Sequence, residues 1–108
     1  MCSSDLLLPY ISGLAAAQGH LVWMAAPLPR VAALLSVTRL FVGGDSGLTH
    51  LAAAAGAARV VALYGPTNPR VWAPVGEQVT VVTPPGPLPA AMADLPVAQV
   101  LEVVRGLL

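Results

Sequence analysis

Four residues near the middle of the chain have the types and spacing of an anion-binding turn. Asp45, Ser46 and Gly47 follow an apolar stretch that ends in two glycines, and His50 comes shortly after them. If a helix begins here, its first backbone N–H groups have no partner inside the helix, and its dipole attracts negative charge. Gly47 has no side chain, so a phosphate can approach the main chain closely. The turn is therefore predicted to bind a phosphate, with His50 as a further donor.

The same turn also has an ordinary structural interpretation. An Asp before Ser-Gly is typical of a helix N-cap, and a single histidine on a short helix is more often structural than functional. The chain contains neither the GxGxxG fingerprint of dinucleotide-binding folds nor the GKS signature of a phosphate loop. The local residues alone leave both interpretations open.

The elements around the turn indicate an α/β fold. Residues 39–44 contain the strand-favouring run LFV and end in two glycines. Residues 45–56 consist largely of small helix formers and end at Gly56, where a C-cap belongs, and residues 59–65 are an apolar strand of the doubly buried kind. A strand, helix and strand in this order predict a parallel pair whose carboxyl ends share one edge, where binding loops gather.

The remaining segments fit the same architecture. Pro29 suits the first turn of a helix that extends to about Val37, with Val31, Leu34 and Leu35 at helical spacing. Residues 66–76 contain three prolines and predict a rigid loop, residues 78–83 a third strand, and residues 84–89 a linker without helix. Residues 6–18 predict a helix, and residues 20–27 predict a buried strand or an extended segment before a loop. A final amphipathic helix over residues 96–108 should bury Val97, Val100, Leu101, Val104 and Leu107, and expose Gln99, Glu102 and Arg105.

Composition limits the classes of protein to consider. The 108 residues allow one domain, and only 9% of them are charged, so part of the surface should rest against something else. Five basic and five acidic residues give a formal net charge of zero, which argues against a nucleic-acid partner. The single cysteine, Cys2, can form neither an internal disulfide nor a zinc site, so no metal is expected from it.

The amino-terminal region raises the question of a membrane span. Residues 6–29 carry no Asp, Glu, Lys or Arg, but prolines, glycines and polar residues divide them into pieces shorter than a bilayer requires. Asp5 precedes the apolar run without any Lys or Arg, which fits a secretory signal badly. We therefore expect a cytoplasmic protein without a transmembrane segment. The opening MCSSDL is similar to translated sequencing-adapter fragments, so residues 1–6 are treated as non-native.

A longer run of sequence resembles a known family. FVGGDSGLTHLAAAAGAARVVALYGPTNPRVWAPVG is similar to the heptosyltransferases of glycosyltransferase family 9. Their pattern of Asp, Ser or Thr, Gly, then His-Leu-Ala is matched here by Asp45, Ser46, Gly47 and the segment from His50 to Ala52. The later GPT turn is matched at residues 65–67, and Trp72, Pro74 and Gly76 match a WxPxG turn. The resemblance covers about residues 25–108.

The resemblance implies a Rossmann-like parallel sheet that forms the carboxyl-terminal half of a two-domain GT-B glycosyltransferase. This half would bind ADP-heptose, and the enzyme would transfer the heptose to the inner core of lipopolysaccharide, with inversion and without a tightly bound cofactor. Peripheral contact with the cytoplasmic face of the inner membrane is compatible with that activity. Carried over by position, the donor-binding residues would be Asp45, Ser46, Gly47, Leu48 and His50, with Ala26 near the adenine through its main chain and Thr67 on the neighbouring loop.

Two departures and two alternatives accompany the resemblance. Pro29 stands where the family often has an acidic residue, which removes a polar contact. The amino-terminal half with the acceptor site and the general base is expected to be absent, so residues 1–108 are interpreted as one partial, inactive domain with no catalytic residue. The alternatives are a UDP-sugar epimerase-like fold, which usually has acidic residues after its Asp-Ser-Gly turn, and a nucleotide-binding module without chemistry.

Overall fold

The computed structural model describes residues 18–20 and 26–108. Within them, three strands form a parallel sheet in the order β1 (Phe41–Gly43), β2 (Val60–Leu63) and β3 (Val79–Val82). Phe41 lies opposite Val60, and Val60 lies opposite Val79, so the three strands start level. All three therefore end at one edge of the sheet, which the sequence predicted for the first two strands.

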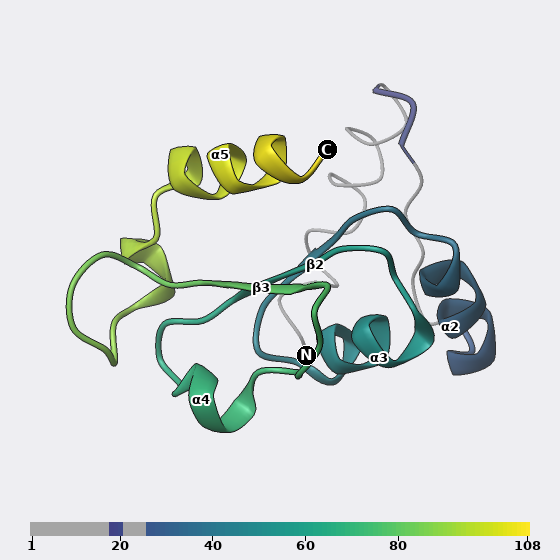
Figure 1. Cartoon of the computed structure of the whole chain (residues 1–108), viewed down its shortest axis with the longest axis horizontal. Helices are drawn as coiled ribbons and strands as arrows, with labels where there is room; N and C mark the ends of the chain where they lie inside the picture. Colours follow the sequence, from purple (N-terminus) through teal and green to yellow (C-terminus); the bar gives the residue numbers. More distant parts are fainter. Residues whose placement is uncertain (1–17, 21–25) are drawn as a thin grey trace, which may run out of the picture.

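Helices cover both faces of this sheet (Figure 1). Helices α2 (Leu28–Ser36) and α3 (Gly47–Ala55) pack together on one face, and α5 (Val97–Leu107) lies along the other. The predicted α/β class, with a Rossmann-like parallel sheet, is confirmed. Gly56 ends α3 in the left-handed conformation with φ 98°, as its predicted C-cap role requires.

The core on the α2–α3 face holds these two helices against the sheet. Leu35 of α2 and Ala52 of α3 pack with Ala57 and with Val60 of β2, and all four are buried. The small side chain of Ala52, which is fully buried, lets α3 lie close to the sheet. This tight packing fixes the amino end of α3 at the carboxyl edge of the strands.

The core on the opposite face corrects the predicted orientation of the last helix. Val100, Val103, Val104 and Leu107 pack against a cluster formed by Val61, Val82 and Leu95. Val97 and Leu101, expected to be buried, are 74% and 45% exposed. Gln99, expected on the solvent side, donates from Nε2 to the carbonyl oxygen of Thr83 at 3.0 Å. This hydrogen bond holds the helix rotated toward Val103, which carries Val97 and Leu101 away from the sheet.

A second correction concerns the loop after β2. The prolines predicted an irregular segment, but Pro69–Trp72 form a single helical turn, α4. Asn68 caps this turn by accepting a hydrogen bond from the Arg70 N–H at 3.0 Å, and Pro69 occupies the first helical position. The turn ends at Ala73, because a residue before proline is disfavoured in helical conformation. A short 3-10 turn, η1 (Met92–Asp94), also follows the linker and was not predicted.

Two of the predicted elements fall largely outside the described part of the chain: the helix over residues 6–18 and the extended segment over residues 20–27. Ala26 itself is described and lies outside regular secondary structure. In the described ranges, none of the helices has both the length and the apolar character needed to cross a bilayer.

Gly43 provides a test of this packing. A Cβ at this position would lie 2.6 Å from Thr49 Oγ1 and 2.6 Å from Phe41 Cε1. We expect Gly43→Ala to lower the free energy of unfolding by about 1–3 kcal/mol through overpacking. Urea titration followed by circular dichroism measures it. Gly106→Ala is the matched control, because nothing lies within 4 Å of the added methyl group. Equal stability of the two variants would contradict the packing described for the β1–α3 junction.

Candidate functional site

The turn between β1 and α3 has the geometry of an open helix amino terminus. Ser46 is the N-cap residue and has an extended backbone, with φ −154° and ψ 161°. Its side chain forms no capping hydrogen bond to the helix. Asp45, Ser46, Gly47 and His50 are all exposed at this end of α3. The turn therefore presents uncapped amide groups, a hydroxyl and an imidazole to solvent at the carboxyl edge of the sheet.

Thr49, which the sequence analysis did not single out, fixes this turn from beneath. Its side chain is fully buried, and its Oγ1 donates to the carbonyl oxygen of Gly44 at 2.7 Å. The hydroxyl of Ser46 lies 3.5 Å from the same Oγ1. A buried threonine hydroxyl needs such a partner, because an unsatisfied one would cost about 1–3 kcal/mol. The sequence offered one indication of this role, because Thr49 is a polar residue in a helix made mostly of apolar residues.

Thr67, from the loop after β2, meets the turn through a direct hydrogen bond. Its Oγ1 donates to Oδ2 of Asp45 at 2.8 Å, joining residues 22 positions apart. The structure thus brings together two predicted site residues that lie on different connections of the sheet.

Two further predicted residues line an apolar pocket instead. Ala26 and Leu48 face a cavity of about 420 Å³ between α2 and the start of α3. The rest of the lining is almost entirely hydrophobic and comes from Val31, Leu34, Leu35, Thr38 and Phe41. The pocket lies next to the polar turn, because Leu48 directly follows Gly47. Sequence periodicity assigned Val31, Leu34 and Leu35 only to helix packing.

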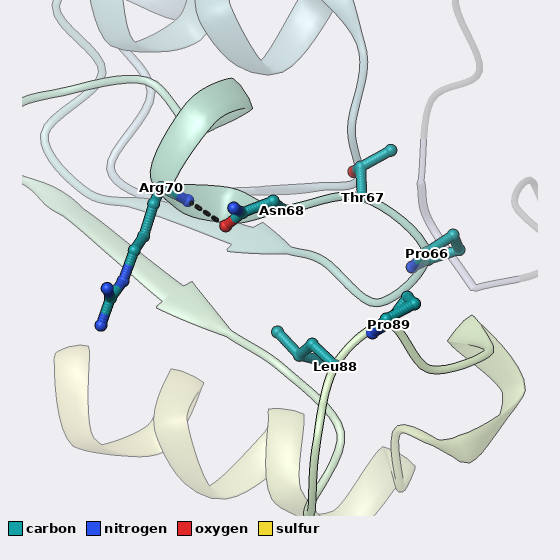
Figure 2. A pocket seen from close by; sticks show the side chains of 6 residues that line it. All are labelled: Pro66, Thr67, Asn68, Arg70, Leu88 and Pro89. Carbon is teal, nitrogen blue, oxygen red and sulfur yellow. Dashed lines mark hydrogen bonds between the residues drawn. The ribbon is translucent and has the colours of Figure 1, made fainter.

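On the other side of the turn, Thr67 borders a more polar hollow of about 450 Å³ (Figure 2). Its walls come from the loop after β2 and from the linker, which contributes Leu88 and Pro89. Arg70 extends away from Thr67 along this hollow, while Asn68 is held by its cap to the Arg70 N–H. The predicted residues are thus distributed over three adjoining places: Asp45 to His50 at the turn, Ala26 and Leu48 in the apolar pocket, and Thr67 between turn and hollow.

A buried phenol supports the same loop. Tyr64 is fully buried directly after β2, and its hydroxyl donates to the carbonyl oxygen of Trp72 at 3.0 Å. Desolvation by burial, and secondarily the negative charge of Asp45, raises the pKa of Tyr64 above its ordinary value of 10.0. The phenol therefore stays protonated and keeps α4 attached to the end of β2. No cluster of three or more His, Cys, Asp or Glu suited to a metal ion occurs in the described ranges.

Comparison with known proteins identifies the family of this chain. The family model described as glycosyltransferase family 9 (heptosyltransferase) matches residues 18–91, and the chain belongs to this family. It is also similar to lipooligosaccharide heptosyltransferase 2 of Haemophilus ducreyi, with 42% identity over 50 residues. That alignment covers 45% of this chain and 14% of the relative. No solved structure gives a significant match.

The raised pKa of Tyr64 gives a pH-dependent prediction. A phenol that holds its proton more tightly in the folded state stabilises the fold fully below the unfolded pKa of 10.0, and this stabilisation is lost as pH rises through the folded pKa. We expect the free energy of unfolding to fall above about pH 10. The free energy of unfolding of Tyr64→Phe should fall less steeply with pH, because this variant lacks the phenol that titrates. Thermal unfolding at intervals between pH 7 and 11 measures both profiles, and parallel profiles would contradict the assignment.

Proposed function

We propose that this 108-residue chain is the donor-binding half of a heptosyltransferase, which transfers heptose from ADP-heptose to the inner core of lipopolysaccharide. Membership of family 9 and the name of the Haemophilus relative support the class of donor and acceptor. The single observation that carries the binding site is the exposed, uncapped amino end of α3 at the carboxyl edge of a parallel sheet.

The diphosphate of the donor binds at this helix end. Amides at the first turn of α3 point out of the helix, and the helix dipole favours a negative group there. Ser46 and His50 are exposed beside them and add a hydroxyl and an imidazole donor. Gly47 leaves open space where a side chain would stand, since nothing lies within 4 Å of a Cβ built there.

Asp45 has a different role from its neighbours in this site. Its carboxylate only accepts hydrogen bonds when ionised, and it repels the like charge of a diphosphate. A hydroxyl of the donor satisfies it instead, so Asp45 binds the sugar part of the nucleotide sugar. The amides of the α3 turn thus bind the phosphate groups of the ligand, and the Asp45 carboxylate binds its sugar.

The adenine occupies the apolar pocket between α2 and α3. Its volume of about 420 Å³ and hydrophobic lining suit a flat heterocycle, and Leu48 leads from the pocket directly to the phosphate-binding turn. Ala26 lines the pocket with only a methyl side chain, so its main chain is the group that contacts the base.

In the reaction, the α3 turn stabilises the departing ADP. Negative charge grows on the diphosphate as the glycosidic bond breaks, and donors fixed in advance at that position lower the barrier. The acceptor hydroxyl attacks from the opposite face of the sugar with inversion. The general base and the lipopolysaccharide site belong to a second domain of the enzyme, which works at the cytoplasmic face of the inner membrane.

Calorimetry of the 108-residue chain with ADP, UDP, ADP-heptose and a UDP-sugar tests the proposal. We expect binding of ADP and ADP-heptose and weaker or no binding of the uridine nucleotides. Asp45→Ala should weaken ADP-heptose more than ADP, because only the former carries the donor sugar. His50→Ala should weaken both by about tenfold or more, as expected for a hydrogen bond to a charged group.

Two exposed residues of the same types serve as controls. Asp94→Ala and His20→Ala remove a carboxylate and an imidazole outside the site, and both should leave binding unchanged. Preference for UDP would favour the epimerase-like alternative. Unchanged ADP-heptose binding in both Asp45→Ala and His50→Ala would show that the site is elsewhere.

A further inference from the structure

The hydrogen bond from Thr67 to Asp45 has a consequence for both residues. A threonine hydroxyl carries one proton, and here that proton is directed at Oδ2 of Asp45 over 2.8 Å. Thr67 therefore has no proton left to donate to a phosphate. Oδ1 of Asp45 is not used in this bond, and no residue of the described ranges donates a hydrogen bond to it.

The loop that carries Thr67 is anchored on the side that leads to it from β2. A Cβ on Gly65 would lie 2.8 Å from the carbonyl oxygen of Ala90, so only glycine fits the close approach of the chain just after the linker. The Ala90 N–H donates to the Gly65 carbonyl oxygen at 2.9 Å. The Tyr64 hydroxyl donates to the Trp72 carbonyl oxygen, and this hydrogen bond joins the start of the loop to the end of α4. Thr67 thus reaches Asp45 from a fixed backbone.

The loop is also anchored on the side that follows Thr67. Asn68 caps α4 through the Arg70 N–H, and the N–H groups of Val71 and Trp72 both donate to the carbonyl oxygen of Asn68 at 3.1 Å. The residue next to Thr67 therefore cannot change conformation without breaking the helical turn. Asp45, by contrast, is exposed, and within the described residues Thr67 is the only side chain that donates to its carboxylate.

We propose that Thr67 is a positioning residue, which holds the carboxylate of Asp45 in one orientation and presents Oδ1 to the donor sugar. Its part in sugar binding rests on the proposed function, whereas its hold on Asp45 does not. An exposed aspartate samples several rotamers, and fixing one before the ligand arrives removes that entropic cost from binding. The GPT turn after β2 therefore acts on the sugar through the turn after β1.

Three variants of the 108-residue chain test the positioning role by calorimetry with ADP-heptose. Thr67→Val keeps the shape and removes the hydroxyl, and it should weaken binding about three- to tenfold, the range of one hydrogen bond. Thr67→Ser restores the hydroxyl and should restore most of the affinity. Thr67→Val in the Asp45→Ala background should cause no further loss, because no carboxylate remains to be positioned.

If Thr67→Val weakens ADP-heptose binding by the same factor with and without the Asp45 carboxylate, Thr67 contacts the ligand directly and the positioning role is wrong. Thr80→Val, on β3 and away from the turn, is the control for loss of a threonine hydroxyl and should bind like the unmodified chain.

A second measurement without ligand separates this inference from the proposed function. Urea unfolding of the chain, Thr67→Val, Asp45→Ala and the double variant should give a coupling of at least about twofold in the folding equilibrium constant. If the unmodified chain binds no ADP-heptose, the proposed function fails, and the coupling alone decides whether Thr67 holds Asp45. Additive effects in this cycle would overturn the inference whatever the ligand.

Discussion

The geometry of the site depends on the way α3 is joined to the end of β1. The buried hydroxyl of Thr49 donates to the Gly44 carbonyl oxygen, and Gly43 lacks the Cβ that would collide with that hydroxyl. The fully buried Ala52 keeps the same helix close to the sheet. Together these contacts leave the amino end of α3 little freedom, so its amides keep a fixed direction at the carboxyl edge of the strands.

The remaining elements support this junction in two ways. The α2–α3 layer encloses an apolar pocket beside the turn, so a ligand held by the amides has a hydrophobic surface within reach. On the other side, the loop after β2 returns to the turn through Thr67 and Asp45. Polar and apolar surfaces thus meet at one place, as expected for a binding site at the carboxyl edge of a parallel sheet.

Much of this arrangement could be predicted from the sequence, because the signals are local. The run LFVGG, the small residues of α3 and the C-cap Gly56 specify a strand, a helix and its end without reference to the rest of the chain. The orientation of α5 could not be read in this way, since Gln99 is polar and its partner, the carbonyl oxygen of Thr83, is a backbone group. The helical turn at α4 was hidden because its cap, Asn68, lies among prolines that also favour loops.

The site could be predicted only in part, because some of its contacts join segments that are distant in the sequence. The types and spacing of Asp45 to His50 predict an anion-binding turn, and the family resemblance implies the nucleotide-sugar donor as the ligand that we propose for it. The contact between Thr67 and Asp45 depends on the parallel register of two strands, which no local pattern specifies.

The proposed function requires that the amino end of α3 binds the diphosphate of the donor. A titration of the ¹⁵N-labelled 108-residue chain with ADP, followed by two-dimensional NMR, tests it most directly. We expect the largest chemical-shift changes at the backbone amides of Ser46, Gly47, Leu48 and Thr49, with smaller changes around the apolar pocket. Saturable shifts centred on α5 or on the linker, with the α3 amides unmoved, would contradict it.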